Sequence, residues 1–483
     1  MRSGVRAAAL LAGSAALAAP AQADDLRGAL VQAYQSNPNL QAARANQRAT
    51  DETVPIANAQ GRPSASGDVS YTEYLKKSDS PLSVSPGRAV SASVNLGVPI
   101  YSGGAVKNSV RGAETRVVAG QADLRATESS VFSQVVAAYM DVILNEAVVG
   151  LNTNNVEVLD VNLRATSDRF EIGDLTRTDV AQSQARLALA RGDLRTAQSN
   201  LIGARERYIQ VVGDAPGKLE PPPPLPGLPA TVEEAVQIAL DNNPDLIAAK
   251  QRSRAAGYDV RVAGAGRLPR VSVFSGLDYS DYLNSIDTSS FGGVAFSQRQ
   301  TTAQAGVRAT IPLFQGGLPA AQRRQAQARE GAALEQEIGA ERDVVAQTRA
   351  AYASWRAANA IIATNQTAVD AATLSLEGVR AENSVGNRTI LEILDAEREL
   401  LQAQVRLVTA RRNAYVAGFT LLAAMGRAEA RDLGLDGGPL YDPQTNYERV
   451  RGKWFDWEND PAPKPQSTRT VDTPAQTGEI PGK

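Results

Sequence analysis

The chain carries, at residues 98–104, the sequence VPIYSGG, which recurs at residues 311–317 as IPLFQGG. In both places an alternating apolar and polar run precedes the proline, and a long segment rich in Ala, Gln and Arg follows the glycine pair. Proline cannot donate to a sheet ladder, and glycine tolerates positive φ, so each stretch predicts a strand that ends and turns into a helix. Two such junctions organise the whole fold.

These junctions belong to an internal duplication. Three further matches keep the same order along the chain, namely LVQAYQSNP at 30–38 with VQIALDNNP at 236–244, Arg62-Pro63 with Leu268-Pro269, and Ile172-Gly173 with Val385-Gly386. The offset between the matched positions stays between 206 and 213 residues. Four matches in one order indicate that the chain contains two copies of one structural unit.

The duplication sets the predicted domain boundaries. Arg2 and Arg6, the apolar stretch 7–19 and the small residues 21–23 indicate an export signal. Four consecutive prolines at 221–224 exclude helix and central strand, and a tail rich in Pro, Thr and Gln favours disorder. We therefore expect a signal peptide at 1–23, a first repeat at 24–214, a Pro-rich linker at 215–230, a second repeat at 231–426, and an equatorial and C-terminal tail at 427–483 that is disordered from about 460. Trp454 and Trp457 are expected to pack on the body of the protein.

Each repeat is expected to contain very long helices. Residues 104 to about 170 run without proline, and at 1.5 Å per residue they predict a helix of about 100 Å. Residues 176 to 212 predict a further helix of about 55 Å, and the second copy repeats the pattern from Thr231, Gly317 and Thr389. A helix of that length cannot be buried in an ordinary globular domain, so it must pack side by side with others.

The strands have the length and alternation of membrane strands. Each predicted strand is close to the roughly 9–11 residues that a tilted strand needs to cross a bilayer. One hairpin alone would fit an amphipathic hairpin on a soluble domain equally well, but two equivalent hairpins in an exported chain favour a barrel. The apolar positions expected to face lipid are Val90, Ala92, Val94, Leu96, Val98 and Ile100 in the first copy, and Ala303, Ala305, Val307, Ala309 and Ile311 in the second.

The number of strands requires assembly. Four strands cannot close a barrel, and open sheet edges are not tolerated in lipid. Two or three copies of the chain would close it, and a polar lumen as wide as a helical tunnel favours three. Tyr101 and Phe314 stand at equivalent strand ends, where an interfacial aromatic belt is expected.

The composition excludes most catalytic chemistry. The chain has no His and no Cys, so His or Cys zinc sites, His-containing triads and thiol nucleophiles are not available. We find no phosphate-binding loop and no dinucleotide fingerprint, and therefore expect no cofactor and no enzyme activity. With 50 basic and 52 acidic residues the chain also lacks the basic excess of a nucleic-acid-binding protein. No run approaches 18 apolar residues, which argues against a transmembrane helix.

Two segments carry a family resemblance. The sequence VGNRTILEILDA at 385–396, with its counterpart RFEIGDLTRTDV at 169–180, resembles the TolC family of outer-membrane efflux proteins. The resemblance implies a mixed α+β membrane protein, a homotrimer whose twelve-stranded barrel continues into an α-helical coiled-coil barrel in the periplasm. It also implies a periplasmic adaptor protein and an inner-membrane ABC or proton-driven transporter as partners, with outer-membrane lipid around the barrel. The lack of a lipid-anchor Cys separates the chain from the lipoprotein branch.

The resemblance assigns a pore constriction to Glu392 and Asp395. Spaced i, i+3 on one helix face, three copies of each would place six carboxylates around the pore and favour cations. The alternative is that both are acids in the first turn of a helix beginning near Thr389, where the helix dipole favours them.

Further roles come from the same resemblance. It implies gate links at Thr178, Asp179, Asn383 and Arg388, and adaptor contacts at Gly173 and Gly386. Asn383 departs from the tyrosine of the best-known relatives, and its shorter side chain weakens the expected lock.

The predicted function is a passive exit duct of a tripartite type I secretion or efflux system, conducting cargo from an inner-membrane pump to the exterior. Both protein cargo and small toxic molecules fit, and the overall pattern of the non-lipidated group slightly favours protein secretion. The alternative from another class is a secreted surface-layer or filament-type structural protein, which Cys-free, Ala- and Gln-rich helices would also suit.

Overall fold

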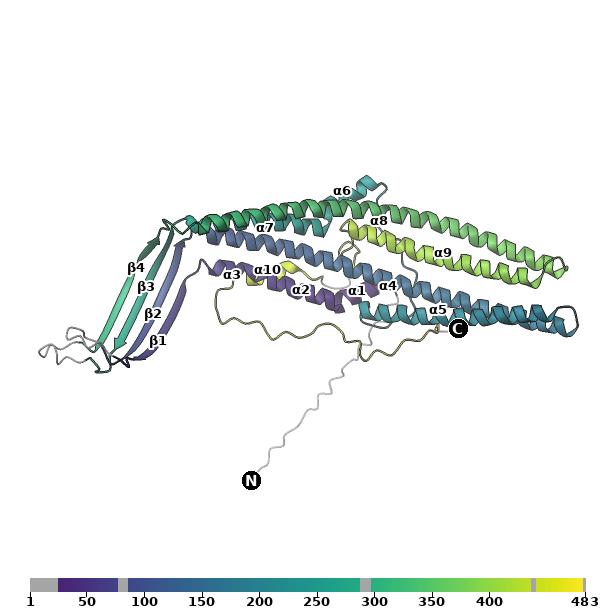
Figure 1. The fold of residues 1–483 in the computed structure, drawn as a ribbon, viewed down its shortest axis with the longest axis horizontal. Coiled ribbons are helices and arrows are strands. Elements are labelled where there is room, and N and C mark those ends of the chain that lie inside the picture. The colour runs from purple at the N-terminus through teal and green to yellow at the C-terminus, as the bar shows by residue number, and fades with distance from the viewer. Residues whose placement is uncertain (1–24, 77–85, 287–296, 436–439, 481–483) are drawn as a thin grey trace, which may run out of the picture.

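The computed structural model describes residues 25–76, 86–286, 297–435 and 440–480. The expected signal peptide lies outside these residues. The chain is strongly elongated, with a four-stranded sheet at one end, two helical hairpin tips at the other, and helices running between them (Figure 1).

The two repeats have the same order of elements. The first contains α1 (Leu26–Ser36), α2 (Pro38–Asp51), α3 (Thr53–Ala59), β1 (Ser64–Glu73), β2 (Arg88–Tyr101), α4 (Ala105–Glu171) and α5 (Arg177–Val212). The second contains α6 (Val232–Asn242), α7 (Pro244–Gly264), the short 3-10 helix η1 (Ala265–Arg267), β3 (Arg270–Asp281), β4 (Arg299–Thr310), α8 (Leu318–Ser384) and α9 (Ile390–Ala424), followed by α10 (Pro443–Val450). Both α4 and α8 contain 67 residues, which corresponds to about 100 Å.

One asparagine in each repeat joins the shorter helices end to end. The side-chain oxygen of Asn37 accepts from the backbone of Asn39 at 3.0 Å and so caps α2, while its amide donates to the Val211 carbonyl at the end of α5 at 2.8 Å. Asn243 caps α7 in the same way and donates to the Ala424 carbonyl at the end of α9 at 2.9 Å. A proline at the first position of each capped helix cannot donate to the preceding helix, which explains the break there. Each long helix therefore runs beside two shorter helices.

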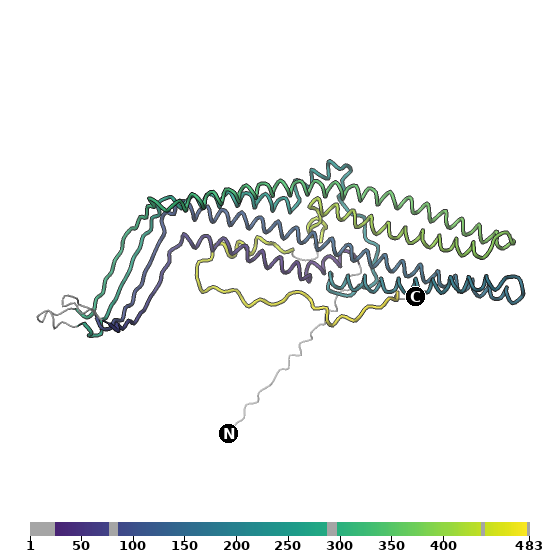
Figure 2. Tube along the Cα trace, in the orientation of Figure 1, coloured from purple at the N-terminus to yellow at the C-terminus, as the bar shows by residue number. Residues whose placement is uncertain are grey.

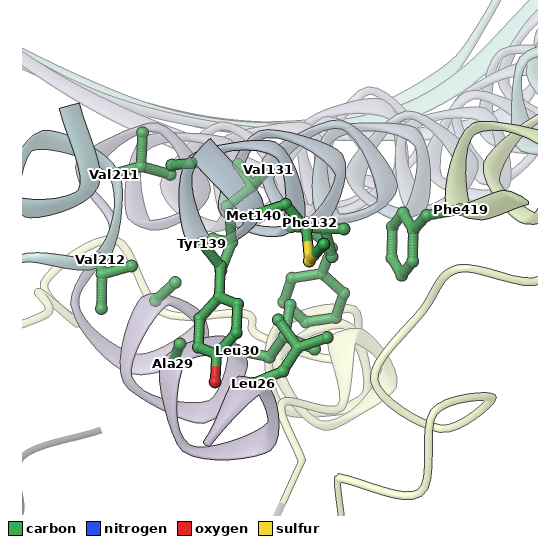
Figure 3. Close-up of a cluster of buried hydrophobic side chains, with 14 of the residues drawn as sticks. Leu26, Ala29, Leu30, Val131, Phe132, Tyr139, Met140, Val211, Val212 and Phe419 are labelled. Atoms are coloured by element: carbon green, nitrogen blue, oxygen red, sulfur yellow. The ribbon is translucent and has the colours of Figure 1, made fainter. Parts of the chain in front are cut away.

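The largest core lies at mid-length, where these helix ends meet. Figure 3 shows α1 residues such as Leu30 packed against Phe132 and Tyr139 of α4, with Phe419 of α9 beside them. By length and composition alone α4 could cross a membrane, contrary to our expectation that no helix would. Since α4 supplies much of this core, its apolar character has a packing role.

Three tyrosine hydroxyls hold the Pro-rich segment against the core. Tyr139 donates to the Glu220 carbonyl at 2.6 Å, Tyr415 to the Pro223 carbonyl at 3.2 Å, and Tyr352 to the Ala230 carbonyl at 2.7 Å. The segment between the repeats is thus an extended strap on the protein surface.

The C-terminal segment is an extended chain that ends beside α5 (Figure 2). Arg205 of α5 donates to the Thr477 carbonyl at 2.7 Å, and the backbone of Gln476 donates to Glu206 at 3.2 Å. The prediction that Trp457 packs on the body is wrong, because its side chain is 93% exposed.

Candidate functional site

The sheet is a single antiparallel layer in the order β1-β2-β3-β4, with β1 and β4 as its edges. Directly opposite residues project to the same face, so the register Val69–Ala92–Tyr279 places these three together, and Val94–Leu277 lies beside them. The same face carries exposed large apolar residues from all four strands, among them Val69, Tyr71, Val94, Leu96, Val273, Leu277, Tyr279 and Val307.

The opposite face carries mainly small and polar residues, with Phe274 and the Arg308 that stacks on its ring as the large ones. Ser66, Asn95, Gly276 and Gln304 form one cross-strand row on it. With strands of 10 to 14 residues, one apolar and one polar face, and two unpaired edges, the sheet fits a segment of a barrel wall in a bilayer.

The other end of the molecule consists of two tight helical turns. Gly173 follows α4 with φ of +80°, and Gly386 follows α8 with φ of +84°. The backbone N–H of Asp174 donates to the Arg169 carbonyl at 2.9 Å, and the backbone N–H of Asn387 donates to the Glu382 carbonyl at 3.0 Å. Both helices therefore end in a Schellman motif. A Cβ at either glycine would have no atom within 4 Å, so both glycines face open space in the chain.

Each turn leads into a capped helix. The Asp179 carboxylate accepts from the backbone and the hydroxyl of Thr176 at 2.9 and 2.7 Å, while the Asp179 backbone donates to that hydroxyl at 3.3 Å. Glu392 accepts in the same way from the backbone and hydroxyl of Thr389 at 2.8 and 3.0 Å. The hydroxyl of Thr176 is also the main cause that lowers the pKa of Asp179.

Arg388 ties the α8–α9 tip together. Its guanidinium donates to Glu382 at the end of α8 and to Glu392 at the start of α9, each at 2.6 Å. The Asn383 side chain donates to the Arg388 carbonyl at 2.6 Å. The backbone N–H of Thr389 together with Arg388 lowers the pKa of Glu392 to about 2, and the two carboxylates raise the pKa of Arg388.

The expected gate residues therefore fall into two separate groups. At the α8–α9 tip the Arg388 carbonyl accepts from Asn383, and the Arg388 guanidinium donates to Glu392, the predicted pore acid. Thr178 is exposed on the first turn of α5, and Asp179 binds Thr176. Among the residues that the structure describes, no hydrogen bond or ion pair joins the Thr178–Asp179 pair to Asn383 or Arg388.

Other contacts join the hairpins, including the bond from Arg412 of α9 to Asp141 of α4 at 2.8 Å and two contacts nearer the tips. Arg186 of α5 donates to Asp395 of α9 at 2.6 Å. Asn162 of α4 donates to both oxygens of Glu397 at 3.0 and 3.1 Å, and Arg380 of α8 donates to the same carboxylate at 3.0 Å.

Of these residues, only Asp395 is among the site residues predicted from the sequence. Glu397 was visible in principle, because it follows Ile393 by four positions and so is an acid on the apolar face of α9, where its side chain is only 5% exposed.

Strands of bilayer length, an apolar outer face and helical columns of about 100 Å together define a conduit channel of the outer membrane. Residues 29–214 and 235–427 match the outer membrane efflux protein family, and the chain belongs to this family. The gap between the two matched ranges contains the Pro-rich strap.

Individual relatives agree with this membership. The chain is 34% identical to the outer membrane efflux protein BepC of Brucella suis over 93% of this chain and 96% of that protein. It is 27% identical to the outer membrane protein TolC of Escherichia coli K12, over 89% and 88% of the two chains. The crystal structure of the Campylobacter jejuni CmeC outer membrane channel superimposes with a TM-score of 0.73 at 17% identity, covering 88% of this chain and 89% of that one, which shows the same fold.

Several predictions from the sequence are thereby confirmed. The TolC-like fold, the outer-membrane location and the role of a transport channel rather than an enzyme agree with the family match and its relatives. The alternative of a secreted surface-layer or filament protein is wrong.

Proposed function

We propose that three copies of this chain assemble into one continuous duct, with a twelve-stranded barrel in the outer membrane and a helical tunnel in the periplasm. The observation that carries the proposal is the pair of open outer edges, on β1 and β4, of a sheet whose apolar residues are exposed. Lipid does not satisfy open backbone groups, so β1 of one copy must pair with β4 of the next. Three copies give a lumen that continues into the space between the helical columns.

The duct is passive and receives cargo from an inner-membrane transporter, ABC-type or proton-driven, through a periplasmic adaptor protein. Gly173 and Gly386 support an adaptor contact at the tips, because the space beside each is open and another helix could approach the backbone closely. Substituting Lys for Gly386 should reduce export while trimer formation and conductance persist. Gly317, at the opposite end of α8, has nearly the same φ (+82°) and the same open space, so the same substitution there is the matched control and should leave export unchanged.

The tips close the duct in its resting state. Three copies of Glu392 and Asp395 would surround the pore, and in the single chain both carboxylates are held by arginines, Arg388 and Arg186. Thr178 and Asp179 are available to meet Asn383 and Arg388 of a neighbouring copy. Opening would break such links and free the carboxylates, which favours passage of cations.

Disulfide trapping tests the assembly, because the chain contains no native Cys. With strands about 4.8 Å apart, β1 and β4 of one chain are separated by about 14 Å, whereas a disulfide needs Cα atoms within about 7 Å. Ser66→Cys in β1, combined with a single Cys scanned along β4, should therefore yield only inter-chain bonds, up to a covalent trimer.

The control pair is Ser66→Cys with Asn95→Cys, which are direct partners on β1 and β2 and should bond within the chain. If that control forms while the whole scan gives only monomers, the β1–β4 closure is wrong. A ladder that stops at the dimer would replace the trimer by a two-chain barrel.

The cargo is either protein or small toxic molecules, and one deletion strain distinguishes them. Loss of a secreted protein from the medium would identify type I secretion, and increased sensitivity to toxic compounds would identify efflux.

A further inference from the structure

The segment that follows α10 exposes an unusual set of aromatic side chains. Its sequence at residues 454–457 is WFDW, and Trp454, Phe455 and Trp457 are 54%, 72% and 93% exposed. Neighbouring exposed aromatic residues on a rigid surface are typical of an interaction site rather than of scattered surface residues. The assembly of the channel through β1 and β4 does not account for them.

The loop that presents these aromatics is closed at its base. The Arg449 guanidinium makes two hydrogen bonds to the Asp460 carboxylate, each at 2.8 Å, and Lys453 lies 3.5 Å from the same carboxylate. The Asn446 side chain of α10 donates to Asp51 of α2 at 2.7 Å. The aromatic loop, residues 451–460, is therefore held on the helical body.

Its position is next to the point where the first strand begins. Arg62, two residues before β1, stacks over the Trp454 ring at 4.7 Å and donates to the Lys453 carbonyl. Figure 1 shows the chain after α10 turning beside α3, at the end of the helices nearest the sheet. The aromatic loop thus lies at the level where the barrel leaves the bilayer on the periplasmic side.

We propose that the aromatic loop is a membrane anchor, in which Phe455 and Trp457 lie in the phospholipid headgroup region of the periplasmic leaflet. Tryptophan favours this region because its ring is apolar and its N–H still reaches water or a headgroup. The exposed side chains of Tyr101 and Phe314 stand at the neighbouring strand ends, so the loop continues a surface that already meets lipid. The anchor would fix the depth of the barrel and fasten α10 to the membrane surface.

Fluorescence of a single tryptophan tests the anchor, because the chain contains only three. Trp355→Phe with Trp454→Phe leaves Trp457, and Phe at 454 can still stack beneath Arg62. The protein is inserted into vesicles of phosphatidylethanolamine and phosphatidylglycerol whose acyl chains carry bromine near the headgroups. Trp457 emission should fall about twofold relative to unbrominated vesicles and should be shielded from aqueous iodide. Vesicle flotation and a trimer band in the gel confirm that the barrel itself is inserted.

Two matched variants complete the test. A protein that keeps only Trp355, which packs against Tyr352 about 55 Å along α8, should show no bromine quenching. In the Trp457-only protein, Phe455→Ser should weaken the quenching, whereas Val471→Ser, at another exposed apolar residue on the distant tail, should not.

Inserted trimers whose Trp457 is unquenched by bromine and open to iodide would overturn the anchor. Trp457 shielded from iodide but unquenched by bromine would also overturn it, because a protein would then cover the loop.

Discussion

Loss of the ion pair between Arg186 and Asp395 is expected to open the duct. The pair joins α5 of one hairpin to α9 of the other at 2.6 Å, with side chains that are 25% and 46% exposed. Arg186→Gln keeps the length of the side chain and removes the charge. For a half-solvated pair we expect about 1 kcal/mol per copy, at the upper end of the range for exposed pairs.

Taken as additive over the three copies, the loss destabilises the closed state by about 3 kcal/mol. This corresponds to a change of about a hundredfold in the ratio of closed to open channels. Conductance of single trimers in planar bilayers measures this ratio directly, and the variant should show frequent or sustained opening where the native channel stays mostly closed.

The chain offers a matched control for this experiment. Arg398 also approaches Asp395, at 3.6 Å, but lies on the same helix three residues further on. Arg398→Gln therefore removes the same charge without cutting a contact between hairpins, and it should leave the closed state almost unchanged. Exchanging the two residues, Arg186→Asp with Asp395→Arg, should restore closure. Equal conductance of Arg186→Gln, Arg398→Gln and the native channel would refute the role of this pair.

Three other changes give measurable results. Glu397→Gln leaves Arg380 of α8 without its carboxylate, and it should lower the unfolding free energy by about 1–3 kcal/mol in thermal denaturation, whereas exposed Glu399→Gln should not. The pKa of Glu392 is lowered from 4.5 to about 2, so its stabilisation of the tip is complete above about pH 4.5 and is lost as the pH falls toward 2. Proteolysis at the α8–α9 turn should therefore increase over this pH window in the native protein, but not in Glu392→Gln. Asn37→Asp keeps an oxygen for the helix cap but turns a buried carboxylate oxygen toward the Val211 carbonyl, so chemical denaturation should show a loss of about 3 kcal/mol or more, and an unchanged stability would show that the cap alone matters.

Much of the candidate site could be read from the sequence because its interactions are local. A Thr followed three residues later by an acid forms a capping box whatever surrounds it, so the acids at 179 and 392 were recognisable as first-turn residues. Gly173 and Gly386 were recognisable as turn residues, and both have the positive φ that such a turn requires.

The partners of the other charged residues could not be read in this way. Arg186 and Asp395 are 209 residues apart, and nothing in either neighbourhood selects the other from the many acids and arginines of the chain. The same holds for Asn162 and Glu397, which are 235 residues apart. Such pairs depend on how two hairpins rotate about their axes, and small side chains along the helices permit several rotations.

The sequence by itself therefore determined the duplication, the strand-to-helix junctions and the helix lengths, because each follows from periodicity, turn chemistry and a fixed rise per residue. Only the tertiary structure decided that Asn37 and Asn243 bridge stacked helices, and that Arg388 binds Glu382 and Glu392 rather than the Thr178–Asp179 pair. It also decided that Trp457 points away from the body. The two asparagine bridges join residues 174 and 181 positions apart, and the position of the Thr178–Asp179 pair relative to Arg388 likewise depends on how the two hairpins pack.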